Sequence, residues 1–316
     1  MVTSPDAGRV KNLGHVKKRV YSVPYHVMMI PALILLIIFK VIPIIGTVMA
    51  FERYNPAAPW FGLASKWVGL QNFHTIFFRH PDAPQVIINT LIIAVSKILL
   101  NLVIPVLFAL LLCECRITWL KRGIQTVVYL PHFLSWVIAG VMFRQIFSTT
   151  GLINTALINL KLVPEPIMFM ASNVYFRPIV VLTDIIKGFG YSAVVYIAAI
   201  TSIDVALYEA ADIDGANRWQ KMRFVTFPGI LPTIVLMMTL ALGNVLNAGS
   251  DQILNMYNPT VYRTGDILDT FVYRIGLQQL QFHLATAVGL VKSIISMLLI
   301  IVSYKLADRF AGYRIF

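Results

Sequence analysis

Long apolar runs alternate with short polar segments along most of the chain. Six runs are long enough, at 1.5 Å per residue, to cross about 30 Å of hydrocarbon as helices. We therefore expect six transmembrane helices at approximately 26–50, 86–112, 123–146, 178–202, 229–249 and 283–304. The pattern predicts an all-α, multi-pass membrane protein, with residues 1–25 as an N-terminal arm and 26–316 as the membrane domain.

The composition supports a bilayer as the main solvent. Of the 316 residues, 58% are hydrophobic and 13% are charged, whereas soluble domains contain about a quarter charged residues. The net charge of +12 does not predict a nucleic-acid partner, because lysines and arginines lie mostly between the apolar runs. The first run, which begins near Tyr25, is too long for the core of a cleaved signal peptide and predicts a first transmembrane helix.

The distribution of basic residues predicts the orientation. Six crossings place both termini on one side of the membrane, and that side carries twice as many lysines and arginines as the other. By the positive-inside rule, the termini and the segment 203–228 face the cytoplasm.

Catalytic and metal-binding patterns are missing from the sequence. Cys113 and Cys115 are too few for a disulfide framework or a zinc site, and no Ser/His/Asp set stands out. The phosphate-binding pattern G-x-x-x-x-G-K-[ST] does not occur either. We expect a protein that is not an enzyme and that binds no cofactor or metal itself.

The charged stretch "YEAADIDGANRWQKMRFVTFP" interrupts the apolar pattern between the fourth and fifth runs. Gly215 predicts a break within it and Pro228 a helix end, so we expect two short amphipathic helices that meet at a turn. Such helices could insert into a groove of a partner protein, with Glu209 paired to a basic group. They could equally lie on lipid headgroups.

This stretch resembles the cytoplasmic EAA loop of permease subunits of ATP-binding-cassette (ABC) importers. The family pattern is Glu-Ala-Ala, three residues, Gly, nine residues, Ile, one residue and Leu-Pro, and here Val225 and Phe227 replace the Ile and Leu. The resemblance covers most of the chain and looks strongest to carbohydrate permeases for complex, often acidic oligosaccharides such as aldouronate or alginate fragments. It assigns ATPase coupling to Glu209, Ala210, Ala211, Asp214, Gly215 and Pro228.

The resemblance also implies partners. The loop would sit in a cleft of a separate ATPase dimer, in which ATP and Mg²⁺ act. A second homologous permease subunit would complete the pathway in the cell membrane. An extracytoplasmic substrate-binding protein would deliver the oligosaccharide, which would cross by alternating access.

A polar stripe predicts a substrate site in the fourth run. Asp184, Lys187, Gly188 and Tyr191 are spaced so that they share one helical face, and Asp184 and Lys187 can neutralise each other. The fifth run carries a second polar pair. Resemblance to the maltose permease places these residues at a sugar site together with Leu240, Asn244 and Asn247.

Two interpretations of Lys187 remain open. Lys187, helped by Arg144, could bind a carboxylate of an acidic oligosaccharide, or it could pair with Asp184 only to join helices. The same pair could serve as the proton relay of a secondary carrier that works without an ATPase. An intramembrane enzyme would need a nucleophile and a base, and the sequence offers neither. No function is assigned to Lys40, Lys97 or Lys292.

Overall fold

The computed structural model describes residues 23–55 and 65–311 of the chain. It forms two compact units, residues 1–47 and 48–316. The first unit contains α1 (Val23–Leu36), a π-helical turn (Ile37–Val41) and α2 (Ile42–Ile45). Most of the expected N-terminal arm 1–25 lies outside the described residues.

The second unit is almost entirely helical in its described part. Its elements are β1 (Glu52–Arg53), β2 (Lys66–Trp67), α3 (Gln71–His74), α4 (Ala83–Glu114), α5 (Thr118–Tyr129), α6 (Trp136–Ile146), α7 (Leu152–Asn159), α8 (Phe176–Thr201), α9 (Val205–Ile213), α10 (Arg218–Lys221), α11 (Phe227–Gly243), α12 (Ser250–Met256), α13 (Tyr262–Gly265), α14 (Leu268–Tyr273) and α15 (Phe282–Ala311). The two short strands pair antiparallel, with Glu52 opposite Trp67.

The apolar helices match the predicted spans, with one exception in shape. In the described residues, five helical segments are long and apolar enough to cross a membrane: Tyr25–Phe51, Ala83–Glu114, Phe176–Thr201, Arg218–Gly243 and Phe282–Lys305. The third predicted span is instead a pair of helices, Thr118–Phe133 and Trp136–Ile146, which meet at an angle of 105°. Pro131 lies in the 3-10 turn Leu130–Phe133 at this bend, which a proline favours because it cannot continue the hydrogen-bond ladder.

The fifth span begins earlier and ends earlier than predicted. Pro228 lies in the first turn of α11, and the helix is continuous from Arg218 through the π-helical turn Met222–Thr226. This wider turn directly precedes the proline, whose missing N–H would interrupt a regular helix. The prediction that Pro228 ends a helix is therefore wrong. At the other end α11 stops at Gly243, so residues 244–249 are not helical.

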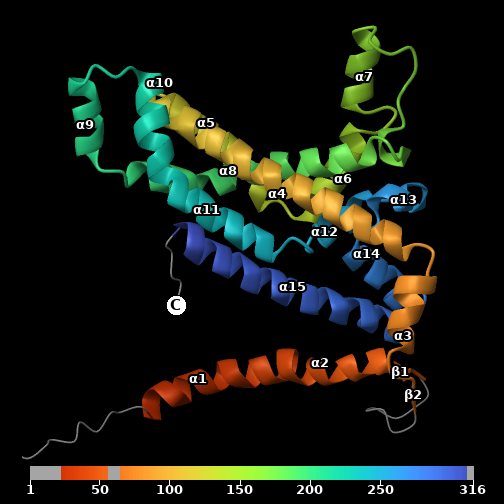
Figure 1. Ribbon diagram of the computed structural model, residues 1–316. Coiled ribbons are helices and arrows are strands. Elements are labelled where there is room, and N and C mark those ends of the chain that lie inside the picture. The colour runs from red at the N-terminus through yellow and green to blue at the C-terminus, as the bar shows by residue number, and fades with distance from the viewer. Residues whose placement is uncertain (1–22, 56–64, 312–316) are drawn as a thin grey trace, which may run out of the picture. The chain divides into compact units, whose positions relative to one another are not determined.

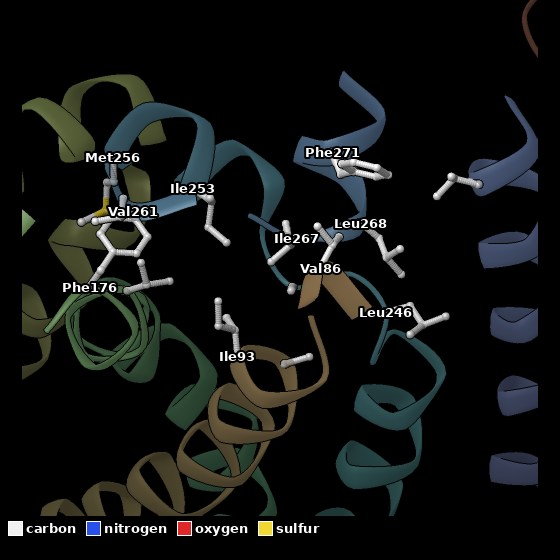
Figure 2. Packing of buried hydrophobic residues seen from close by; sticks show 14 of the residues in the cluster. Val86, Ile93, Phe176, Leu246, Ile253, Met256, Val261, Ile267, Leu268 and Phe271 are labelled. Atoms are coloured by element: carbon white, nitrogen blue, oxygen red, sulfur yellow. The ribbon is translucent and has the colours of Figure 1, made fainter. Parts of the chain in front are cut away.

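The largest buried cluster joins α4 and α8 to the short helices α12–α14 and the start of α15. Figure 2 shows Phe176 of α8 beside Met256 and Val261, and Leu268 beside Val86 of α4. All these side chains except Leu268 are at most 2% exposed, and Leu268 is 8% exposed. This cluster fixes the segment that follows the helix break against α4 and α8.

A group of charges holds α14 against the start of α4. Arg274 donates to Asp266 at 2.6 Å and to Asp82 at 3.1 Å, and Thr270 also donates to Asp266. Burial raises the pKa of Asp266, while the hydrogen bonds from Thr270 and Arg274 act in the opposite direction. The buried carboxylate is thus compensated by a cation and a hydroxyl group.

Within the second unit, α9 and α10 lie at one end, and the C-terminal part of α15 reaches the same end (Figure 1). Helices α7 and α13 lie at the opposite end. The long helices α4, α8, α11 and α15 run between the two ends and connect them.

Candidate substrate cavity and coupling segment

A cavity of about 290 Å³ lies among α4, α8 and the C-terminal half of α11 with the residues that follow it. Its lining is Ala94, Lys97, Ile98, Asn101, Leu102, Asp184, Ser192, Tyr196, Met237, Ala241, Asn244, Asn247 and Gly249. Asp184, Asn244 and Asn247 of the predicted site are therefore brought together. The cavity combines amides, a hydroxyl group, a phenol and a charged pair, which suits a ligand rich in hydroxyl groups.

Lys97 of α4 is the centre of the polar wall of this cavity. Its side chain is 9% exposed, and its Nζ lies 3.1 Å from Asp184 Oδ1. The same ammonium group donates to the carbonyl oxygen of Ala248 at 2.8 Å and to Gln252 Oε1. Asn101 donates to the second oxygen of Asp184 at 3.0 Å. All three donors of the ammonium group are thus used.

The predicted ion pair between Asp184 and Lys187 is therefore replaced. Although the two residues share a helical face, Asp184 meets Lys97 across the α4–α8 contact. Sequence spacing identifies neighbours on one helix but not a lysine on another helix, so the sequence assigns no role to Lys97.

Lys187 instead lies at the bend between α5 and α6. Its Nζ donates to the carbonyl oxygen of His132 at 2.9 Å and lies 5.2 Å from the ring centre of Trp136. Tyr191 stacks on the imidazole of His132 with centroids 4.0 Å apart and an interplanar angle of 5°. In the described part of the chain, Lys187 forms no ion pair.

Of the remaining predicted site residues, Gly188 lies beside the cavity wall, whereas Leu240 and Arg144 do not line the cavity. A Cβ at Gly188 would lie 3.9 Å from Asn101 Oδ1, so Gly188 faces the cavity wall. Leu240 is exposed on α11, one turn before Asn244. Arg144 is exposed in the last turn of α6, about 12 Å along the helix axis from Trp136.

The two predicted asparagines do not form a helical pair, because α11 ends before them. Asn244 Nδ2 donates to the carbonyl oxygen of Leu240 at 3.2 Å. Asn247 Oδ1 accepts from Lys292 of α15 at 3.3 Å, and Lys292 also donates to Asp269. Lys292 is therefore linked to the cavity lining.

The segment 203–228 forms the predicted pair of short helices with a turn at Gly215. Asp204 caps α9, and the turn is a Schellman motif: Gly215 N–H bonds to Asp212 O at 3.1 Å and Ala216 N–H to Ala211 O at 2.9 Å. Gly215 has a φ of +76°, which favours glycine. Asn217 and Gln220 then form a reciprocal capping box at the start of α10.

Two side-chain contacts hold α9 against the following helix. Lys221 lies 2.6 Å from Asp212, and the hydroxyl groups of Tyr208 and Thr226 lie 2.9 Å apart. Of the predicted coupling residues, Ala211 is half-buried and the others are exposed: Glu209, Ala210, Asp214, Gly215 and Pro228. Large apolar side chains are also exposed here, with Ile213 at 87% and Trp219 at 74%.

Metal-binding geometry is not found among the described residues, where no group of three or more His, Cys, Asp or Glu side chains is placed to hold an ion.

Comparisons with known sequences identify relatives along most of the chain. The family model described as the binding-protein-dependent transport system inner membrane component matches residues 116–312. The polygalacturonan/rhamnogalacturonan transport system permease protein YteP of Bacillus subtilis (strain 168) is 36% identical over 292 residues, which cover 92% of this chain and 89% of YteP. The arabinooligosaccharides permease AraP of the same organism is 26% identical over 285 residues, 89% of this chain and 88% of AraP.

Solved structures show the same fold. A chain of a bacterial ABC transporter involved in the import of the acidic polysaccharide alginate matches with a TM-score of 0.82 and 34% identity, over 92% of this chain and 96% of that one. A chain of the bacterial alginate transporter in complex with a periplasmic protein that holds an alginate pentasaccharide matches with a TM-score of 0.84 and 32% identity, over 93% and 97%. The predicted permease fold is confirmed, and the carrier interpretation is not favoured. The chain belongs to the family of binding-protein-dependent transport system inner membrane components and is a sugar permease of the ABC importers.

Proposed function

We propose that this chain carries an acidic oligosaccharide across the cell membrane and that the segment 203–228 couples transport to a separate ATPase dimer. The observation that carries the proposal is the geometry of this segment. It has a rigid Schellman turn at Gly215 and exposes Glu209, Ile213 and Trp219 at one end of the long helices. An apolar surface with a fixed shape and a carboxylate suits a groove of a partner protein.

We also propose which subunits work together with this chain. ATP and Mg²⁺ act in the ATPase, and this chain transmits the movement to the helices that surround the cavity. A second homologous permease subunit faces the cavity from the other side. A substrate-binding protein delivers the sugar at the extracytoplasmic end. The structure of the related alginate transporter in complex with a periplasmic protein supports this last partner.

The acidic character of the substrate rests on Lys187. This cation has one carbonyl partner, and no carboxylate pairs with it in the described residues. A stacked pair of rings, His132 and Tyr191, lies beside it. Aromatic faces bind the C–H surface of a sugar ring, and a free ammonium group binds a uronate carboxylate. The relatives named for polygalacturonan and alginate support this substrate class.

In inverted membrane vesicles an importer would move the sugar out of the vesicle. The test therefore uses right-side-out vesicles, or proteoliposomes that contain the permease pair, the ATPase and the binding protein. We expect uptake of uronate oligosaccharides to require enclosed ATP and to persist when a protonophore removes the proton gradient. Uptake driven by a proton gradient without the ATPase would contradict the proposal and support a secondary carrier.

A further inference from the structure

The break in the fifth span lies directly beside the cavity. After Gly243 the chain leaves the helix, forms a turn at 244–246, and re-enters a helix at Ser250. Non-helical backbone at membrane depth is tolerated only where protein groups or a wet cavity satisfy its polar atoms. The side chains that fix the conformation of residues 244–249 therefore also determine which polar atoms of this segment face the cavity.

Lys97 holds the end of the break. Its ammonium group donates to the carbonyl oxygen of Ala248, which would otherwise lack a helical partner. Gly249 follows with a φ of +90°, and a Cβ there would lie 2.6 Å from Lys97 Nζ. The lysine thus occupies the space beside Gly249, at a backbone conformation that favours glycine.

Lys292 holds the middle of the break from the other side. Its Nζ lies 3.3 Å from Asn247 Oδ1, and Asp269 also accepts from it. An ammonium group can only donate, so Asn247 has to meet it with the carbonyl oxygen of its amide. The NH₂ group of Asn247 donates no hydrogen bond within the described residues, and Asn247 lines the cavity.

The amide of Asn244 is held through its NH₂ group, whereas that of Asn247 is held through its oxygen. Its NH₂ group donates to the carbonyl oxygen of Leu240, which leaves Oδ1 as the free polar atom. The break therefore presents two amides of opposite polarity to the cavity, an acceptor at Asn244 and a donor at Asn247. Neighbouring donors and acceptors match the hydroxyl and carboxylate groups of a sugar.

We infer that Lys97 and Lys292 are positioning residues for the sugar cavity and that Lys292 raises the affinity for the sugar by turning the NH₂ group of Asn247 toward the substrate. This inference rests on the proposed function. When Lys292 is lost, the Asn247 amide can rotate, and a substrate acceptor then loses its donor. The effect appears in the affinity for the sugar, because the cavity itself is retained.

The test is a double-mutant cycle on uptake in proteoliposomes, with the KM for a uronate oligosaccharide measured at a saturating concentration of the binding protein. Lys292→Met and Asn247→Ala should each raise KM about twofold to tenfold, since one hydrogen bond contributes about 0.5–1.5 kcal/mol. The double variant should show no more than the larger single effect. Lys66→Met, at an exposed residue of β2, is the control and should retain the wild-type KM.

Each outcome decides a different claim. Additive effects of Lys292→Met and Asn247→Ala on KM would overturn the inference, because Lys292 would then act independently of Asn247. An Asn247→Ala variant with the wild-type KM would overturn the proposed sugar site and the inference with it.

If Lys292→Met does not assemble, Asn247→Asp replaces it. This variant keeps a partner for Lys292 but presents an oxygen to the cavity, so KM should rise, and an unchanged KM would again overturn the inference.

Discussion

The ammonium group of Lys97 lies 3.1 Å from the carboxylate of Asp184, and this ion pair joins two membrane-spanning helices at the wall of the cavity. Asp184 and Lys187, which share one face of α8, form no ion pair in the described residues. The two lysines therefore have different roles. Lys97 has all its donors engaged within the protein, whereas Lys187, which does not line the cavity, donates to the carbonyl oxygen of His132 and is the residue that we propose for the substrate carboxylate.

Replacing Lys97 should destabilise the protein. Lys97→Met leaves the Asp184 carboxylate in the cavity wall with Asn101 as its remaining partner, and breaking a buried ion pair costs about 3–5 kcal/mol. We expect the lower end of this range, because Asp184 is partly open to the cavity. Thermal unfolding in detergent should show a lower midpoint. The double variant Lys97→Met/Asp184→Asn should recover part of the loss, and a wild-type midpoint for Lys97→Met alone would contradict the prediction.

Replacing Lys187 should change transport more than stability. Lys187→Met removes a charged donor to the substrate carboxylate, and such a hydrogen bond contributes about 1.5–3 kcal/mol. The KM for a uronate oligosaccharide should therefore rise by roughly tenfold to a hundredfold. The matched control is the same oligosaccharide with its carboxyl groups esterified, for which both proteins should show the same KM. Unchanged uptake of the acidic sugar by Lys187→Met would rule out the carboxylate role.

Which residues are tolerated at position 215 should depend on the backbone conformation that they can adopt and not on the size of their side chains. A Cβ at this position meets no atom within 4 Å, so the φ of +76° is the main constraint. Gly215→Val should cost about 1–2 kcal/mol in the left-handed region and disturb the Schellman turn. Sugar-stimulated ATP hydrolysis by the assembled transporter should fall. Gly215→Asn, which adopts this conformation more readily, should retain more activity, and equal activity of the two variants would argue against a conformational role.

Gly249, which lines the cavity, should be more sensitive to substitution than Gly289 of α15. Gly249→Ala combines a φ of +90° with a Cβ 2.6 Å from Lys97 Nζ. Gly289→Ala in α15 places its Cβ in open space within a helix, where alanine is favoured. We expect a lower unfolding midpoint for Gly249→Ala than for Gly289→Ala. The reverse order would show that neither the backbone conformation of Gly249 nor its contact with Lys97 constrains this position.

The sequence predicts the helices well because each apolar run is long and uniform. The runs near 86–112, 178–202 and 283–304 correspond to α4, α8 and α15. The breaks are less predictable. Apolarity continues through the bend at Pro131 and past Gly243, so a pattern of hydrophobic residues extends a helix across both points.

The lining of the candidate site can be predicted in part, since Asp184, Asn244 and Asn247 line one cavity. Spacing along α8 correctly groups Asp184 with a polar environment but assigns it the wrong lysine, because the partner lies on α4. His132 and Trp136 were missed as neighbours of Lys187, since only the 105° bend brings them there. Lys292 carried a signal, a lysine inside an apolar helix, but its link to Asn247 depends on the packing of α15.

The account depends most on the contact between the segment 203–228 and an ATPase. A cysteine in place of Ile213, which is 87% exposed on α9, tests this contact directly when Cys113 and Cys115 are replaced by serine. In the assembled transporter, a thiol cross-linker should join this cysteine to the ATP-binding subunit, and the yield should change when ATP is added. Labelling of the cysteine by a membrane-impermeant reagent from outside intact cells, or the absence of any cross-link to an ATP-binding subunit, would contradict the account.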